Sequence, residues 1–342
     1  MTVPLATLSG LTRTKSIGDG RLKHRPTIRC NFPFIKKFDN VSHTNHDQPM
    51  SCMEVWGGNT STDTSIHRPG LSCRVWSQSF GASDAGGDVY FLSSCASGRL
   101  TRFLLADVCG HGESAAEGAM ALRQLMRQNV NRIRQTQLVQ AVNRELVLAD
   151  QSGRFATALV GTWFMPTSEF VLSNAGHPTP LLYRVSSGVW SPCEAKPRKS
   201  VAMQNMPLGI DERTGYSEHR ITLHRGDLLL CYTDALSESL DGSGKYIQTA
   251  GLLDILQSLD ETPSEALIQR LLEQLESASP GNLARDDVTV MLFEVTTKSV
   301  PLIDTLLAPW RVLRGLGVDR VNTSGPQCST TSDDSNSRAP LC

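Results

Sequence analysis

Apolar side chains recur at two different spacings between residues 71 and 295, and the flanking segments show neither spacing. Short alternating or continuous apolar runs predict β-strands, whereas steps of three and four predict amphipathic helices. We therefore expect one folded domain over residues 71–297. Residues 1–70 are expected to form a disordered leader without a core of its own, and residues 298–342 a tail with one short helix followed by disorder.

The first half of this domain has the pattern of a hairpin followed by two helices. Val89–Leu92 and Phe103–Val108 resemble strands, and the glycine of Ala96-Ser97-Gly98 suits the turn between them. From Ala115 to Ile133 the apolar residues recur at steps of three and four, which predicts a helix. The same period continues from Leu138 to Leu146 and predicts a second one.

The second half changes to strands that are separated by Pro, Gly and Ser. The most apolar of them, Leu228–Tyr232, follows a predicted tight turn at His224–Asp227 and is expected to be buried on both faces. Leucines from Leu267 to Leu275 predict another helix, and Val288–Val295 a final strand. The remaining predicted strands are Phe155–Phe164, Phe170–Asn174, Leu181–Val185 and Arg220–Leu223.

Strands thus come in groups and helices in pairs, rather than in strict alternation. Such an order favours antiparallel sheets covered by helices over a doubly wound parallel sheet. The fold class predicted from the pattern is therefore α+β.

Composition narrows the possible functions. The net charge of −1, from 33 basic and 34 acidic residues, gives no indication of a nucleic-acid or membrane partner. Nine cysteines without a CxxC pair favour reduced thiols in a cytoplasmic protein over a disulfide framework or a zinc site. No GxSxG motif is present, which argues against a serine hydrolase.

Four aspartates stand at the ends of predicted strands or in the adjoining turns: Asp88, Asp107, Asp234 and Asp286. A carboxylate at the end of a buried strand is costly unless something neutralises it. Oxygen ligands without Cys or clustered His suit Mg²⁺ or Mn²⁺. Any one of these aspartates could instead cap a turn, since Asp is favoured there. Four in the same relation to strands favour a metal site.

Five short motifs occur in a fixed order around these aspartates. They are Gly86-Gly87-Asp88, Asp107-Val108-Cys109-Gly110-His111-Gly112, Asn174-Ala175-Gly176-His177-Pro178, Tyr232-Thr233-Asp234 and Asp286-Asp287-Val288-Thr289. Each motif alone is weak, but the ordered set resembles the SpoIIE-type branch of the PPM (type 2C) metal-dependent phosphatases. The resemblance covers residues 71–296.

This resemblance implies a four-layer α-β-β-α sandwich with two Mn²⁺ or Mg²⁺ ions at one edge of the sheets. It assigns Asp107 to both ions, Asp234 and Asp286 to the first, and Asp88 with the carbonyl of Val108 to the second. It further implies that a metal-bridging hydroxide attacks the phosphorus of phosphoserine or phosphothreonine. The expected substrate is a phosphorylated regulatory protein, such as a STAS-type anti-anti-sigma factor.

Several positions depart from the family pattern or leave two interpretations open. Phe91 replaces an Asp, Ala235 a Gly and Cys109 a Ser, so metal affinity could be altered. His111 is interpreted as a catalytic proton donor and His177 as a second candidate, although both could pack tight turns. The alternative function is a catalytically impaired relative that acts as a protein-binding module. The oligomeric state is not predicted.

Overall fold

The computed structural model of the protein describes residues 52–81, 85–95, 98–110, 112–149, 153–193, 204–259 and 263–296. Within these residues twelve strands form two six-stranded sheets, and every strand pair is antiparallel. Sheet A has the order β1 (Cys52–Gly58), β4 (Asp88–Cys95), β5 (Leu100–Val108), β6 (Ala156–Phe164), β7 (Glu169–Ala175), β10 (His219–Thr222). Sheet B has the order β2 (Thr62–Arg68), β3 (Leu71–Gln78), β12 (Val288–Val295), β11 (Leu228–Tyr232), β8 (Leu181–Arg184), β9 (Val189–Pro192).

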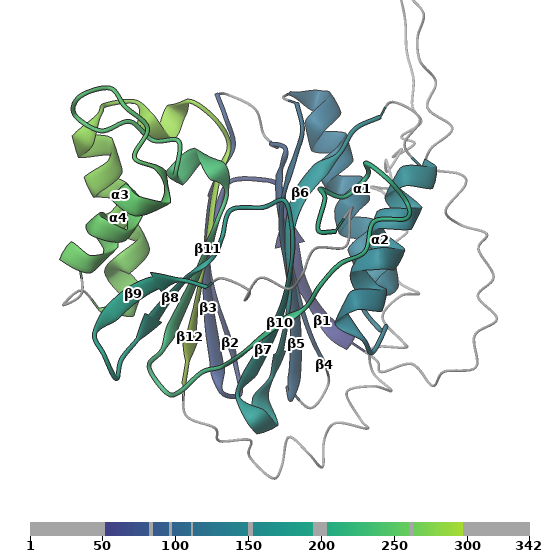
Figure 1. Ribbon diagram of the computed structural model, residues 1–342. Helices are drawn as coiled ribbons and strands as arrows, with labels where there is room; N and C mark the ends of the chain where they lie inside the picture. The colour runs from purple at the N-terminus through teal and green to yellow at the C-terminus, as the bar shows by residue number, and fades with distance from the viewer. Residues whose placement is uncertain are drawn as a thin grey trace, which may run out of the picture. The chain divides into compact units, whose positions relative to one another are not determined.

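Two pairs of helices cover the outer faces of the sheets, as Figure 1 shows. Helices α1 (Glu113–Asn129) and α2 (Gln135–Ala149) pack on sheet A, and α3 (Gln248–Ser258) and α4 (Ser264–Ala278) on sheet B. Short 3₁₀ turns η1 (Met165–Thr167), η2 (Asp234–Leu236) and η3 (Asn282–Ala284) complete the order. The predicted α+β class and its α-β-β-α layers are confirmed.

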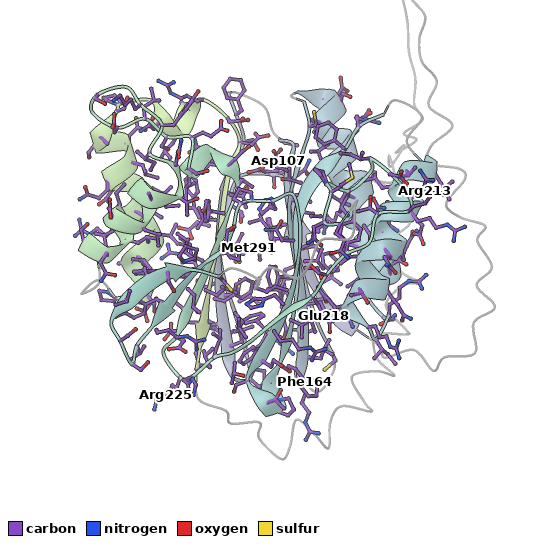
Figure 2. All side chains as sticks on the ribbon, viewed as in Figure 1. Asp107, Phe164, Arg213, Glu218, Arg225 and Met291 are labelled. Atoms are coloured by element: carbon purple, nitrogen blue, oxygen red, sulfur yellow. The ribbon has the colours of Figure 1, made fainter. Side chains whose placement is uncertain are left out.

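The main core lies between the two sheets. Phe293 of sheet B packs against Phe103 and Phe170 of sheet A, with ring centroids 4.6 and 5.4 Å apart. Met291 lies in the same layer, fully buried (Figure 2). This contact between large apolar side chains of both sheets fixes how the sheets stack.

Strand β11 is buried on both faces, as its apolar run predicts. Leu229 and Cys231 belong to the core between the sheets, whereas Leu228, Leu230 and Tyr232 pack under α3 and α4. Thr233, the residue that follows this strand, is thereby held in rigidly packed surroundings.

The boundary expected at residue 71 is wrong, because residues 52–68 form β1 and β2. Both are edge strands. In β2 only Ile66 is fully buried, and polar residues surround it, so no apolar alternation marks the strand. Strands β3 and β9 and helix α3 were likewise not predicted. The expected leader over residues 1–51 and the tail over 298–342 lie outside the described residues.

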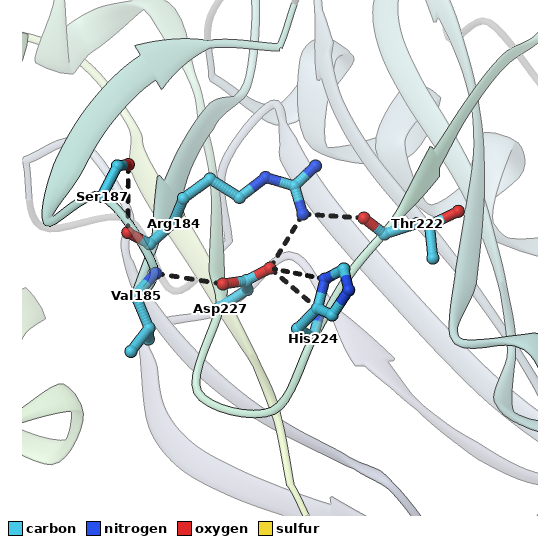
Figure 3. A network of polar contacts seen from close by, with 6 residues as sticks. All are labelled: Arg184, Val185, Ser187, Thr222, His224 and Asp227. Carbon is cyan, nitrogen blue, oxygen red and sulfur yellow. Dashed lines mark hydrogen bonds and ion pairs between the residues drawn. The ribbon is translucent and has the colours of Figure 1, made fainter.

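Far from Asp107, the turn between β10 and β11 is fixed by a polar cluster that we call the Asp227 clasp: Arg184, Val185, Thr222, His224 and Asp227 (Figure 3). Asp227 is 2% exposed and accepts hydrogen bonds from the backbone N–H groups of Val185 (3.0 Å) and His224 (2.9 Å). Arg184 donates to Asp227 at 2.8 Å and to the carbonyl of Thr222 at 2.7 Å. The clasp therefore ties sheet B to the end of β10 in sheet A.

No helix among the described residues is both long and apolar enough to cross a membrane.

Candidate active site

The four predicted aspartates come together at one end of the sandwich. Asp88 opens β4 and Asp107 stands one residue before the end of β5, directly opposite it in the ladder. Asp234 follows β11 and Asp286 precedes β12, and these two strands are antiparallel neighbours in sheet B. Figure 2 shows Asp107 at the gap between the two sheets. We call this group the acidic edge.

Asp88 accepts a hydrogen bond from the residue that follows β11 of the opposite sheet. It is 4% exposed, and the hydroxyl of Thr233 donates to its carboxylate at 2.8 Å. The backbone N–H of Thr289 in turn donates to the Thr233 hydroxyl at 2.9 Å. Burial, and then the negative charge of Asp107, raise the pKa of Asp88 well above its usual value, although the threonine hydrogen bonds oppose this.

Asp107 is linked electrostatically to carboxylates of the opposite sheet. Burial first, and then the charges of Asp234 and Asp286, raise the pKa of its carboxyl from 3.8 to about 7. Burial also raises the pKa of Asp234, with further contributions from Glu238 and Asp286. Asp107 of sheet A is therefore coupled to the two predicted aspartates next to the strands of sheet B.

No lysine or arginine of the described residues forms an ion pair with these four aspartates. Their oxygens are hard donors that suit a divalent cation such as Mg²⁺ or Mn²⁺. In the described part of the chain no three acidic, histidine or cysteine side chains already converge as a finished metal shell. The donor chemistry of the four carboxylates nevertheless fits a divalent cation.

A fifth aspartate of this edge was missed in the sequence. The carboxylate of Asp287 accepts hydrogen bonds of 2.6 Å from the backbone N–H groups of Phe80 and Gly87. A Cβ atom at Gly86 would overlap that carboxylate, and one at Gly87 would lie 3.0 Å from the carbonyl oxygen of Val108. The two glycines therefore make room for an aspartate and a carbonyl, and the doubled Asp286-Asp287 beside a Gly-Gly pair was the available signal.

The other motif residues have different positions. His177 is 6% exposed, and burial lowers its pKa to about 3. Its backbone N–H and carbonyl are both bonded by the amide of Asn174, so its motif forms a closed turn. We conclude that His177 packs a turn. His111 lies outside the described residues.

The departures from the family pattern leave the four aspartates in place. Phe91 is fully buried, three residues along β4 from Asp88, and the alternation of the strand puts it on the opposite face, toward α1. Ala235 is buried against the apolar layer under α3 and α4. Cys109 is exposed. Phe91 is thus packed away from the acidic edge.

The fold is that of the PP2C-type phosphatases. The RsbU and RsbW domains of Rv1364c from Mycobacterium tuberculosis match with a TM-score of 0.59 and 24% identity, over 75% of this chain and 72% of that one. The PP2C phosphatase domain of SpoIIE from Bacillus subtilis, with a fragment of its regulatory domain, matches with a TM-score of 0.55 and 18% identity, over 68% of this chain and 64% of that one. The SiaA-PP2C domain of Pseudomonas aeruginosa matches with 0.54 and 14%, over 64% and 85%.

The family model of Stage II sporulation protein E (SpoIIE) matches residues 97–296, and the chain belongs to this family. No curated protein sequence matches it. Membership and fold together class the chain as a protein-serine/threonine phosphatase of the PPM type.

Proposed function

We propose that the protein hydrolyses phosphoserine or phosphothreonine on a regulatory protein, and that the acidic edge with the carbonyl of Val108 holds two divalent cations, Mn²⁺ or Mg²⁺. The observation that supports this most is the uncompensated charge of the edge. Carboxylates from both sheets raise the pKa of their neighbours, and no described lysine or arginine pairs with the four aspartates. Bound cations would remove this repulsion.

The electrostatic links suggest how the ligands divide. The charge of Asp287 raises the pKa of both Asp88 and Asp107, but the larger charge effect comes from Asp107 for Asp88, and from Asp234 and Asp286 for Asp107. Asp107 is therefore the residue that we expect to serve both ions, with Asp88 and Val108 on one side and the sheet B aspartates on the other. When bound, such ions lower the pKa of a water and neutralise charge on the phosphate.

His111 is proposed as the proton donor to the leaving hydroxyl of the substrate. It lies four residues beyond Asp107 in the same motif, in the segment that joins β5 to α1. A positioned acid of this kind contributes on the order of 100-fold or more to the rate. Replacement of His111 by Gln should lower kcat and leave the affinity for Mn²⁺ unchanged.

The proposed substrate is a phosphorylated STAS-type anti-anti-sigma protein, and the proposed compartment is the cytoplasm. The substrate class rests on the family, and the compartment on thiol chemistry. The five cysteines whose side chains the structure describes are all free thiols, as expected in a reducing environment.

The alternative is an impaired family member that binds a phosphoprotein without hydrolysing it. Each of the four aspartates stands at the acidic edge, and Phe91 faces away from it, which favours the active enzyme. We keep the alternative as an outcome of the test below.

Hydrolysis of p-nitrophenyl phosphate, measured with Mn²⁺ and with EDTA, tests the proposal. Wild type should be active only with Mn²⁺, and Asp107→Asn should fall to background. Asp254→Asn is a matched control, because it removes one exposed carboxylate on α3, away from the acidic edge. Turnover by wild type in verified metal-free buffer would refute the cation site. Mn²⁺ binding without hydrolysis of this substrate or of a phosphorylated STAS protein would favour the binding module.

A further inference from the structure

The turn at Gly86-Gly87, which leads into Asp88, is held by residues from three separate parts of the chain. The N–H of Gly86 donates to the carbonyl of Asn59 at 2.8 Å, and the side-chain amide of Asn59 donates to the carbonyl of Gly86 at 3.0 Å. The N–H of Gly87 donates to Asp287 at 2.6 Å, and its carbonyl accepts from the N–H of Val108 at 3.3 Å. All four polar backbone groups of the turn are therefore bonded.

Asn59 contributes more than a local contact. It follows β1, is 4% exposed, and its amide also donates to the carbonyl of Ala116 in the first turn of α1 at 3.2 Å. One uncharged side chain thus joins three parts of the chain: the end of β1, the turn before Asp88 and the helix that follows Asp107 and Val108. A buried amide with defined partners is costly to replace, because its partners lose their hydrogen bonds.

We infer that Asn59 is a positioning residue of the cation site, which sets the place of Asp88 by holding both polar groups of Gly86. This inference rests on the proposed function, because it concerns the same carboxylates. It also assigns a role to the segment that the sequence pattern took for a leader. Asn59 and Asp88 both lie outside residues 97–296, the region that the family model matches.

The nature of the contact predicts which quantity changes. Asn59 touches backbone and not substrate, so its loss should loosen Asp88 and weaken cation binding. Residues that orient a metal ligand typically change metal affinity by about 10-fold to 100-fold when replaced. Saturating Mn²⁺ should then restore most of kcat, whereas KM for the phosphorylated substrate should stay the same.

The test compares Mn²⁺ binding by isothermal titration, and the Mn²⁺ concentration for half-maximal activity, in the full chain. Asn59→Ala should bind Mn²⁺ about 10-fold more weakly than wild type. Asn129→Ala is the matched control. Asn129 is also 4% exposed and also donates to a backbone carbonyl, that of Leu125 at 3.0 Å, but it lies at the far end of α1. Its replacement should lower stability without changing Mn²⁺ affinity.

A milder variant, Asn59→Ser, keeps a hydroxyl donor and serves if Asn59→Ala does not fold; we expect it to bind Mn²⁺ several-fold more weakly than wild type. Unchanged Mn²⁺ affinity in a folded Asn59 variant would overturn the inference, as would an equal loss in Asn129→Ala. A wild type that neither binds Mn²⁺ nor hydrolyses phosphate would instead refute the proposed function, which separates the two failures.

Discussion

The acidic edge and the Asp227 clasp surround their buried carboxylates with opposite kinds of neighbour. In the clasp, Asp227 is 2% exposed, and an arginine and two backbone N–H groups surround it. At the acidic edge, Asp88 is 4% exposed but has Asp107 as its charged neighbour and a threonine as its donor. In the clasp, groups of the chain itself satisfy the carboxylate of Asp227. At the acidic edge, the negative charge is left to be neutralised by a partner from outside the chain.

This difference assigns each region a separate task. A fully bonded buried carboxylate stabilises the folded state, and its removal leaves donors without acceptors. Carboxylates that repel one another weaken the folded state until a cation arrives. The clasp is thus expected to carry stability, and the acidic edge to carry function at a cost in stability.

The largest expected effect on stability comes from the clasp. Asp227→Ala removes the acceptor of Val185, His224 and Arg184, and should lower the free energy of unfolding by about 3 kcal/mol. Urea unfolding with EDTA present measures it. Asp254→Ala, which removes an exposed carboxylate on α3, should stay within about 0.5 kcal/mol of wild type. Equal losses in the two variants would remove the distinction between structural and surface carboxylates.

Without metal, Asp107→Asn should change the free energy of unfolding in the opposite direction, toward greater stability. The substitution removes one of several converging charges, so in EDTA at pH 7.5 the variant should be more stable than wild type by about 1–3 kcal/mol. In saturating Mn²⁺ the order should reverse, because wild type gains binding free energy that the variant loses. Melting curves under both conditions test this. A variant that melts well below wild type in EDTA would identify Asp107 as a structural cap.

The pH dependence sharpens the same contrast. In the folded protein the pKa of Asp107 is about 7, above its usual 3.8. The carboxyl group therefore contributes fully to the free energy of unfolding below about pH 4, and this contribution is lost as the pH rises through 7. His177 has a lowered pKa and acts in the opposite direction between pH 6.5 and about 3, but it is common to both proteins. The stability advantage of Asp107→Asn in EDTA should therefore grow by about 2 kcal/mol from pH 5 to pH 7.5. A constant difference would contradict the raised pKa.

The smallest effect should come from the imidazole of the clasp. The side chain of His224 is 80% exposed, and its ring nitrogen lies 3.8 Å from the carboxylate of Asp227. His224→Ala should change the free energy of unfolding by less than about 0.5 kcal/mol, because its backbone N–H still donates to Asp227. A larger loss in urea unfolding would show that the exposed ring contributes to the clasp.

The sequence predicts strands that are buried on both faces better than strands with an exposed face, for a physical reason. Strands such as β5 and β11 are buried on both faces and leave continuous apolar runs, so they were predicted. Strand β2 has one fully buried side chain and leaves no pattern. Nor does a sequence pattern reveal the role of Asn59, because that role depends on hydrogen bonds to backbone groups distant in sequence.

For the acidic edge, the spacing of motifs predicts the four aspartates, because each stands at the end of a recognisable strand. The sequence does not reveal that Asp287 bonds the Gly86-Gly87 turn, since that contact depends on how the two sheets stack. The orientation of Phe91, by contrast, follows from strand alternation alone, because Phe91 stands three residues after Asp88 in one strand.

The position of β12 has a consequence for how the protein is made. This last strand of the domain lies between β3 and β11, so sheet B has no centre until residues 288–295 have been synthesised. A nascent chain can complete β4 to β7 earlier, but β3 and β11 then keep unpaired edges that invite association with other chains. Asp286 arrives together with β12. The acidic edge therefore cannot be complete before the residues that fill the centre of sheet B have been synthesised.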